Sequence, residues 1–246
     1  MLFSSLIFVC AFFPLFFALY YLLPKRSLRN ALLLIFSILF YAWGRVVYLP
    51  LILAASLIGW GGGRAIGAFR EKNRPGAARA SLVVSLVLLL GMLGVFKYAG
   101  FFVENLNLIP GISLNVPLIE LPIGISFYTF QSISYLIDVY RGTTPVQRNF
   151  RNLLLYISMF PQLIAGPIVR YGTVAKEITD RHVDAHDLSE GMMRFLRGLG
   201  KKVILANQLS EVSTQLLTGA GLEALTTAGA WIGIIAFTFQ IYFDFS

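Results

Sequence analysis

Polar side chains recur at helical spacing within one apolar stretch of the chain, Leu118–Gly142. They are separated by three, four and three residues, which places them on one face of a helix. The four are Tyr128, Gln131, Tyr135 and Asp138. Phenol, amide and carboxylate groups gathered on one face could line a chamber in which a polar substrate reacts or is transported.

A polar face of this kind is unfavourable in contact with lipid. A carboxylate at the centre of a membrane helix costs about 2.5–3.5 kcal/mol, and Gly124 and Gly142 extend the stripe. The stripe should therefore face protein or a water-filled cavity. It could equally join helices through polar contacts, and the sequence does not decide between these interpretations. Gln162 and Asp244, from two other apolar segments, are further candidates for lining a chamber.

The composition is that of an integral membrane protein. Of the 246 residues 57% are hydrophobic and only 13% are charged, with a mean hydropathy of +0.74. A soluble domain carries about 25% charged residues. The net charge of +8 comes from Lys and Arg in short loops, where they meet lipid head groups. No nucleic-acid motif is present, so we expect membrane lipid and no nucleic acid as a partner. The single cysteine, Cys10, allows no internal disulfide.

Apolar runs predict an all-α, multi-pass bundle with several transmembrane helices, and Pro14 should kink the first of them. The predicted spans are Leu2–Leu23, Ala31–Trp43, Val46–Gly61, Ser81–Tyr98, Leu118–Gly142 and Leu225–Phe245. The intervening loop Gly62–Ala80 is strongly basic. The glycine-rich run Gly59–Gly67 follows no strand, so we expect small residues for helix packing there and no phosphate site.

Basic residues alternate along the successive loops, with three, one, five, none and three Lys or Arg. Because basic loops stay in the cytoplasm, this pattern predicts an extracytoplasmic N-terminus. The loops near residues 25–29, 64–79 and 141–151 should then be cytoplasmic.

The apolar segment Asn152–Val169 conflicts with simple alternation, because a basic stretch follows it. Pro161, Gly166 and Pro167 interrupt this segment, so we expect a re-entrant hairpin buried in protein or lining a cavity. A full span followed by a charged exterior loop is the alternative.

His182 and His186 stand four residues apart, a spacing that a metal site could use. A solvated loop explains them better, with Asp187 capping a helix and Glu190 completing the cap. We therefore expect no metal site. The following segment, Leu188–Gln208, is predicted to form an amphipathic helix at the membrane surface.

Two long motifs carry a family resemblance. LPIGISFYTFQSISYLIDVYRG at 121–142 resembles the signature of the membrane-bound O-acyltransferase (MBOAT) family of the alginate O-acetylation type. FPQLIAGPIVRY at 160–171 is similar to a second signature of that group. The first 24 residues, FYAWG at 40–44, FKYAGFF at 96–102 and YFDFS at 242–246 follow in the family's order, so the resemblance covers essentially the whole chain.

The resemblance implies an enzyme of the cytoplasmic (inner) membrane that moves acetyl groups onto hydroxyls of an extracytoplasmic polysaccharide such as alginate. It implies acetyl-CoA or a derivative as donor, no bound cofactor, and extracytoplasmic polysaccharide-acetylation proteins as partners. The family's catalytic histidine lies downstream of the YFDFS motif, and neither His182 nor His186 matches it, so no catalytic residue is assigned here. We expect residues 1–246 to be the N-terminal part of one MBOAT-like membrane domain, inactive alone, also because no polar flank follows the last span.

Three alternatives stand beside this interpretation. D-alanyl transfer to teichoic acid is related chemistry, but GPIVRY at 166–171 resembles the alginate type more closely. A transporter or flippase could use the polar stripe as a pathway, although the sequence shows no inverted repeat of broken helices. A non-catalytic membrane subunit is the third.

Overall fold

The computed structural model describes residues 4–109, 112–115, 119–163, 168–218, 222 and 225–246. The chain forms two compact units, and each is considered by itself. The first holds Pro14–Arg181, and the second combines Leu2–Phe13 with His182–Ser246. The interpretation of residues 1–246 as one membrane-embedded domain stays a prediction.

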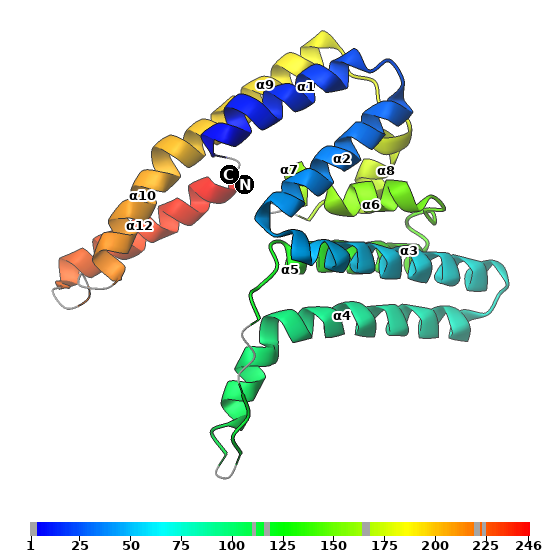
Figure 1. The fold of residues 1–246 in the computed structure, drawn as a ribbon, viewed down its shortest axis with the longest axis horizontal. Coiled ribbons are helices and arrows are strands. Elements are labelled where there is room, and N and C mark those ends of the chain that lie inside the picture. The colour runs from blue at the N-terminus through cyan, green and yellow to red at the C-terminus, as the bar shows by residue number, and fades with distance from the viewer. Residues whose placement is uncertain (1–3, 110–111, 116–118, 164–167, 219–221, 223–224) are drawn as a thin grey trace. The chain divides into compact units, whose positions relative to one another are not determined.

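Every regular element in these ranges is a helix, which confirms the all-α class (Figure 1). The elements up to Thr179 are a π-helical turn Phe8–Phe12, α1 (Phe13–Leu22), α2 (Arg26–Gly44), a 3-10 turn Val46–Tyr48, α3 (Leu49–Glu71), α4 (Pro75–Leu106), α5 (Ile125–Arg141), α6 (Phe150–Ser158), α7 (Phe160–Leu163) and α8 (Tyr171–Thr179). The remainder are α9 (Ala185–Gly200), a π-helical turn Lys201–Ala206, α10 (Asn207–Leu217) and α12 (Thr227–Phe245).

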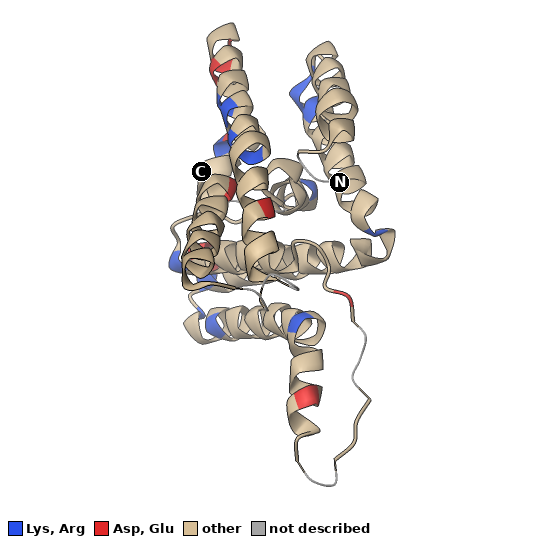
Figure 2. Ribbon diagram, turned by 90° about the vertical axis from the view of Figure 1, so that its left-hand side faces the viewer, with Lys and Arg blue, Asp and Glu red and all other residues tan. Residues whose placement is uncertain are grey.

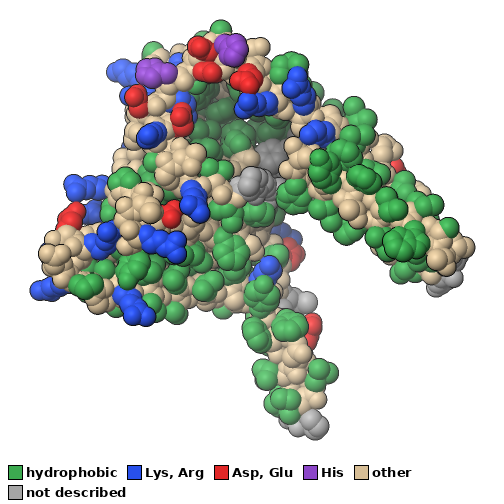
Figure 3. Space-filling view, turned by 180° about the vertical axis from the view of Figure 1, so that it is seen from behind, with side chains coloured by type: hydrophobic (Ala, Val, Ile, Leu, Met, Phe, Trp, Pro, Cys, Tyr) green, Lys and Arg blue, Asp and Glu red, His purple; other side chains and the backbone are tan. Residues whose placement is uncertain are grey.

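Four helical stretches in the described ranges are long and apolar enough to cross a membrane, and they make this a multi-pass membrane protein. They are Arg26–Gly44, Val46–Glu71, Pro75–Leu106 and Thr227–Phe245. Their large apolar side chains lie exposed, as lipid-facing residues do: Ile35 is 55%, Val87 63% and Trp231 65% exposed (Figure 3). Charged residues are few along these helices (Figure 2).

The first apolar helix covers Phe8–Leu22, which is shorter than the predicted span Leu2–Leu23. It starts with a π-helical turn. Pro14 is the second residue of α1 and follows this turn directly. Proline lacks the N–H that an unbroken helix needs, which fits the irregular turn before it, and the kink stays a prediction.

The predicted loop Gly62–Ala80 is wrong. Helix α3 continues to Glu71 and α4 begins at Pro75, so the connection is only Lys72–Arg74. Asn73 has a φ of 51°, a left-handed conformation that lets the chain reverse there. Lys72 and Arg74 lie in this turn, whereas Arg64, Arg70 and Arg79 lie on the two helices, and all five side chains are exposed.

Helix α5 is also shorter than the predicted span Leu118–Gly142, and Leu118 lies outside the described residues. It has 17 residues and begins and ends next to Gly124 and Gly142, whose φ values are 73° and 78°. These glycines therefore terminate the helix, and the prediction that they extend its polar stripe is wrong. Because α5 packs against α3, α4, α6 and α8, it needs no lipid-facing surface along its whole length.

The segment Asn152–Val169 is broken, as its prolines predicted. Helix α6 ends at Ser158, and α7 has only four residues. The break falls at Met159, just before the Phe160–Pro161 pair, because proline suits the start of a helix. Gly166 and Pro167 lie outside the described residues. Re-entry from one side of the membrane stays a prediction.

The second unit is built on a helix longer than the predicted Leu188–Gln208. Helix α9 runs into the π-helical turn and then into α10, and α12 packs against both of the latter. Asp184 caps α9, since its carboxylate accepts from the Asp187 backbone N–H at 2.7 Å and Asp187 accepts in return. The prediction that Asp187 caps this helix with Glu190 is therefore wrong by three residues.

The glycine-rich run on α3 packs closely against α5. A Cβ on Gly63 would lie 2.8 Å from the phenol ring of Tyr135, and one on Gly59 would lie 3.5 Å from Ser132. A Cβ on Gly61 would meet no atom within 4 Å. The helix-packing interpretation of this run is confirmed.

We expect Gly63→Ala to destabilise the protein by about 1–3 kcal/mol, because the fully buried Tyr135 ring cannot move away. Gly61→Ala is the matched control on the same helix and should leave stability unchanged or raise it by up to about 1 kcal/mol. Apparent melting temperatures in detergent measure both effects. Equal melting temperatures for the two variants would contradict the close packing of α3 on α5.

Candidate functional site

The polar face predicted on α5 exists, and it is buried except at the partly exposed Asp138. Tyr128 and Tyr135 are fully buried and Gln131 is 1% exposed. Thr129 and Ser132 are also fully buried on this helix, and the spacing argument missed them. Ser132 could have been found, since it follows Tyr128 by four residues. The polar face of α5 is therefore wider than the stripe that the sequence indicated.

At the C-terminal end of α5 three buried tyrosine hydroxyls are paired. The Gln147 backbone N–H donates to the Tyr135 hydroxyl at 3.0 Å, and the Gln147 side-chain amide donates to the Tyr171 hydroxyl at 2.5 Å. The Tyr156 hydroxyl donates to the Val169 carbonyl at 2.7 Å. The Tyr171 ring stacks edge-on against both other tyrosine rings, with centroids 5.1 Å apart. This cluster fastens α5, α6 and α8 together.

The Tyr171 hydroxyl in this cluster is not suited to act as a general base. Burial raises its pKa above the usual value, and the Gln147 amide that donates to it opposes the rise only in part. The phenol therefore stays protonated at neutral pH. Its role in the structure is packing and hydrogen bonding.

At the N-terminal end of α5 several buried polar atoms lack a hydrogen bond of ordinary geometry, although the Tyr41 and Tyr128 hydroxyls interact with each other. Four buried atoms in the described residues make no hydrogen bond of ordinary geometry: the hydroxyls of Tyr41, Tyr128 and Thr129 and the Oε1 atom of Gln131. The Tyr41 and Tyr128 rings meet edge to face at 6.4 Å and influence each other electrostatically. An unsatisfied buried polar group costs about 1–3 kcal/mol. Water or a bound polar molecule would remove that cost, and this favours the chamber interpretation.

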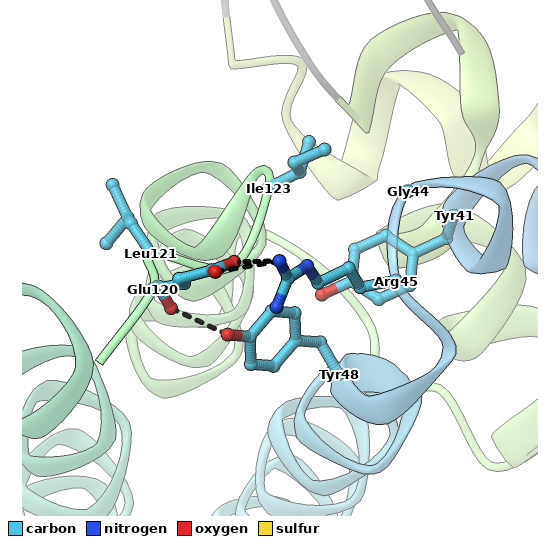
Figure 4. Close-up of a pocket in the computed structure, with 7 residues that line it drawn as sticks. All are labelled: Tyr41, Gly44, Arg45, Tyr48, Glu120, Leu121 and Ile123. Carbon is cyan, nitrogen blue, oxygen red and sulfur yellow. Dashed lines mark hydrogen bonds and ion pairs between the residues drawn. The ribbon is translucent and has the colours of Figure 1, made fainter. Parts of the chain in front are cut away.

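A cavity of about 180 Å³ lies next to this cluster, where α2 ends and the chain approaches α5 (Figure 4). Arg45 Nη2 donates to both carboxylate oxygens of Glu120, at 2.7 and 2.6 Å. The Tyr48 hydroxyl donates to the Glu120 carbonyl at 2.9 Å. The Tyr41 hydroxyl points toward this cavity beside Arg45 (Figure 4). Tyr41 thus connects the cavity with Tyr128 on α5.

These groups suit a polyhydroxylated molecule. Phenols and the Gln131 amide can each donate to or accept from a sugar hydroxyl, and the Arg45 guanidinium can donate to hydroxyls or a carboxylate. Sequence spacing could not reveal Tyr41, because α2 and α5 are far apart in the chain. The only sequence signal was its place in FYAWG, one of the motifs that carry the resemblance.

The other candidate residues lie elsewhere. Asp138 is at the opposite end of α5 from Tyr128, about 15 Å away along the helix axis. Gln162 is on α7, and its amide donates to the Tyr156 carbonyl at 2.5 Å. Asp244 belongs to the second unit, where it pairs with Lys202 at 2.5 Å. Of the six candidates, only Tyr128 and Gln131 therefore belong to the cluster beside the cavity.

The histidine segment brings one set of possible metal ligands together, and the absence of a metal site there stays a prediction. In the described ranges, the possible ligand atoms of Asp184, His186 and Asp187 lie within 4.8 Å of one another, and all three residues are exposed. The reciprocal cap of α9 already accounts for both aspartates.

The sequence was compared with known proteins. No family model matches the sequence, and no solved structure matches it. The "Probable alginate O-acetylase AlgI" proteins of Pseudomonas syringae and Pseudomonas aeruginosa are each 42% identical over this whole chain. The resemblance to alginate O-acetylases is confirmed. A peptidoglycan O-acetyltransferase of Helicobacter pylori is 30% identical, also over the whole chain. The chain spans about half the length of these relatives: 47% of each alginate O-acetylase and 52% of the peptidoglycan enzyme.

We expect two buried tyrosines to respond differently to loss of their hydroxyls. Tyr156→Phe removes a hydrogen bond to a carbonyl and should lower the free energy of unfolding by about 1 kcal/mol. Tyr128→Phe removes a hydroxyl without an ordinary partner in the described part of the chain and should cause no loss of stability. Thermal unfolding in detergent compares them. A larger loss for Tyr128→Phe would show that its hydroxyl is needed for folding.

Proposed function

We propose that this chain forms the acceptor-side part of a membrane-bound O-acetyltransferase that modifies an extracytoplasmic polysaccharide such as alginate. The observation that carries the proposal is the cluster of buried hydroxyl and amide groups beside the Arg45–Glu120 cavity, whose polar atoms lack hydrogen bonds of ordinary geometry in the described residues. Relatives named as O-acetylases or O-acetyltransferases support the reaction class. They do not favour D-alanyl transfer, transport or a non-catalytic subunit.

The proposed orientation places the cavity where an exported polymer can reach it. The basic residues lie at the start of α2, around the α3–α4 turn and between α5 and α6. Placing these regions in the cytoplasm puts the N-terminus, the end of α2 and the start of α5 on the extracytoplasmic side of the cytoplasmic (inner) membrane. The cavity then opens toward the polymer and its acetylation partners.

In the proposed reaction an acceptor hydroxyl attacks the carbonyl carbon of an acetyl thioester, such as acetyl-CoA. The carbon–oxygen bond forms, the carbon–sulfur bond breaks, and the hydroxyl proton ends on the released thiol. Tyr41, Tyr128 and Gln131 would hold the acceptor hydroxyls in place, which is how positioning lowers a barrier. We assign the base to none of the described residues, so these side chains are positioning residues.

The test uses residues 1–246 in place of the matching part of the Pseudomonas aeruginosa alginate O-acetylase, in cells that lack their own copy. Gln131→Leu should reduce polymer acetylation about tenfold, the effect of one lost hydrogen bond to substrate. Membrane insertion should be unchanged, since Gln131 Oε1 has no partner in the described residues. Ser134→Leu, one turn further along α5 and half-buried, is the control. Equal acetylation with Gln131→Leu and Ser134→Leu would refute the positioning role.

The orientation is tested separately with single cysteines in a Cys10→Ala background. An impermeant thiol reagent applied to spheroplasts should label Leu108→Cys and leave Lys72→Cys unlabelled. Asn149→Cys and Thr173→Cys should both stay unlabelled if the segment between them is re-entrant. Labelling of Lys72→Cys would reverse the orientation, and opposite results at 149 and 173 would overturn re-entry.

A further inference from the structure

A second, larger hollow of about 490 Å³ lies in the first unit between α2, α6 and the end of α8. Its polar lining comes from two arginines, three asparagines, a serine and a threonine: Arg26, Ser27, Asn30, Asn149, Arg151, Asn152 and Thr179. Its apolar lining consists of Ala31, Leu34, Ile35 and Leu155, with Ile178 at the end of α8. No acidic side chain of the described residues lines this hollow, which we call the α2–α6 cleft.

The lining changes from polar to apolar along both helices in the same direction. On α2 the polar residues are in the first turns, and Leu34 and Ile35 follow about 12 Å further along the axis. On α6 the polar residues start at the N-cap Asn149, and Leu155 follows about 9 Å further. The cleft therefore has a cationic, hydrogen-bonding end and an apolar end, which match the polar head and the apolar tail of an amphiphile.

Part of the polar end is already paired within the protein. Arg26 binds Asp180 at 2.9 Å, and both side chains stay exposed. The Asn30 side chain donates to the Ile178 carbonyl at 2.8 Å and accepts from Arg181 at 3.1 Å. These contacts hold the end of α8 against α2 and leave the neighbouring donors of α6 free.

The donors on α6 have no protein acceptor in the described ranges. Asn149 Oδ1 accepts from the Arg151 backbone N–H at 3.0 Å, which directs the amide nitrogen of this cap residue elsewhere. The Arg151 guanidinium and the Asn152 amide make no ion pair or side-chain hydrogen bond within the described chain. Guanidinium and amide donors beside a helix N-terminus without an acidic residue suit a phosphate group.

We propose that the α2–α6 cleft binds an anionic phospholipid of the surrounding membrane. Arg151, with Asn152 and Arg26, binds the headgroup phosphate, and an acyl chain lies along Leu34 and Ile35. The apolar end favours a lipid over a free phosphate compound, since the cleft continues from the basic residues to Leu34 and Ile35, where a small soluble phosphate makes no contact. Basic pockets between membrane helices are a known setting for anionic headgroups. The proposal is independent of acetyl transfer.

Native mass spectrometry of the detergent-purified chain tests this, with phosphatidylglycerol and phosphatidylcholine of identical acyl chains as probes. The protein should retain phosphatidylglycerol several-fold more than phosphatidylcholine. Arg151→Gln should lower phosphatidylglycerol retention about fivefold, the effect of one basic residue at an anionic surface. Arg79→Gln, an exposed arginine on α4 outside the cleft, is the matched control and should leave retention unchanged.

A second pair of variants tests whether an acyl chain binds at the apolar end of the cleft. Ile35→Trp should reduce retention of both lipids by filling the chain path, while Leu39→Trp, one turn on and 53% exposed, should not. Equal retention of the two lipids, or equal effects of the two arginine variants, would overturn the proposal. Arg151-dependent binding of inorganic phosphate or coenzyme A, without phosphatidylglycerol preference, would assign the cleft to a soluble phosphate compound instead. Melting temperatures confirm that every variant is folded.

Discussion

The burial of polar side chains on α5 is the constraint on which the rest of the first unit depends. A helix that carries Tyr128, Thr129, Gln131 and Tyr135 on one side cannot present that side to lipid without a large penalty. Other helices must cover it, and α3, α4, α6 and α8 do so. The glycines of α3 allow this cover to be close, because a backbone without Cβ atoms lets the Tyr135 ring lie against it.

The two ends of this buried face differ in a way that separates structural from functional polarity. Near Tyr135 every hydroxyl is engaged, through Gln147 or a backbone carbonyl, and the cluster is closed. Near Tyr128 the hydroxyl and amide groups are buried without ordinary partners in the described residues. The two interpretations of the stripe, polar joint and chamber lining, therefore apply to different ends of the same helix. Only the second end adjoins the cavity.

The sequence predicted the helical class and this face because both are local, periodic properties. It could not predict Tyr41, whose proximity to Tyr128 results from the tertiary structure and not from spacing along the chain. It placed Asp138 and Asp244 with the chamber residues because periodicity and hydropathy carry no information on distance between segments. The basic run after Gly62 does not form the predicted loop. Arginine and alanine are good helix formers, and the two helices extend through it. Gly124 and Gly142 fitted the periodicity by chance, since their left-handed conformations end the helix.

The modest hydrophobicity of α5 has a consequence for how the protein is made. Helices α3 and α4 meet the length and hydropathy of independent spans, whereas α5 does not. A segment that inserts weakly into the bilayer alone needs a protein surface to pack against. The glycine face of α3 is such a surface. Because α3 and α4 precede α5 in the chain, they leave the ribosome first and can already be in the membrane as a template. The order of the helices along the gene thus matches the order in which assembly requires them.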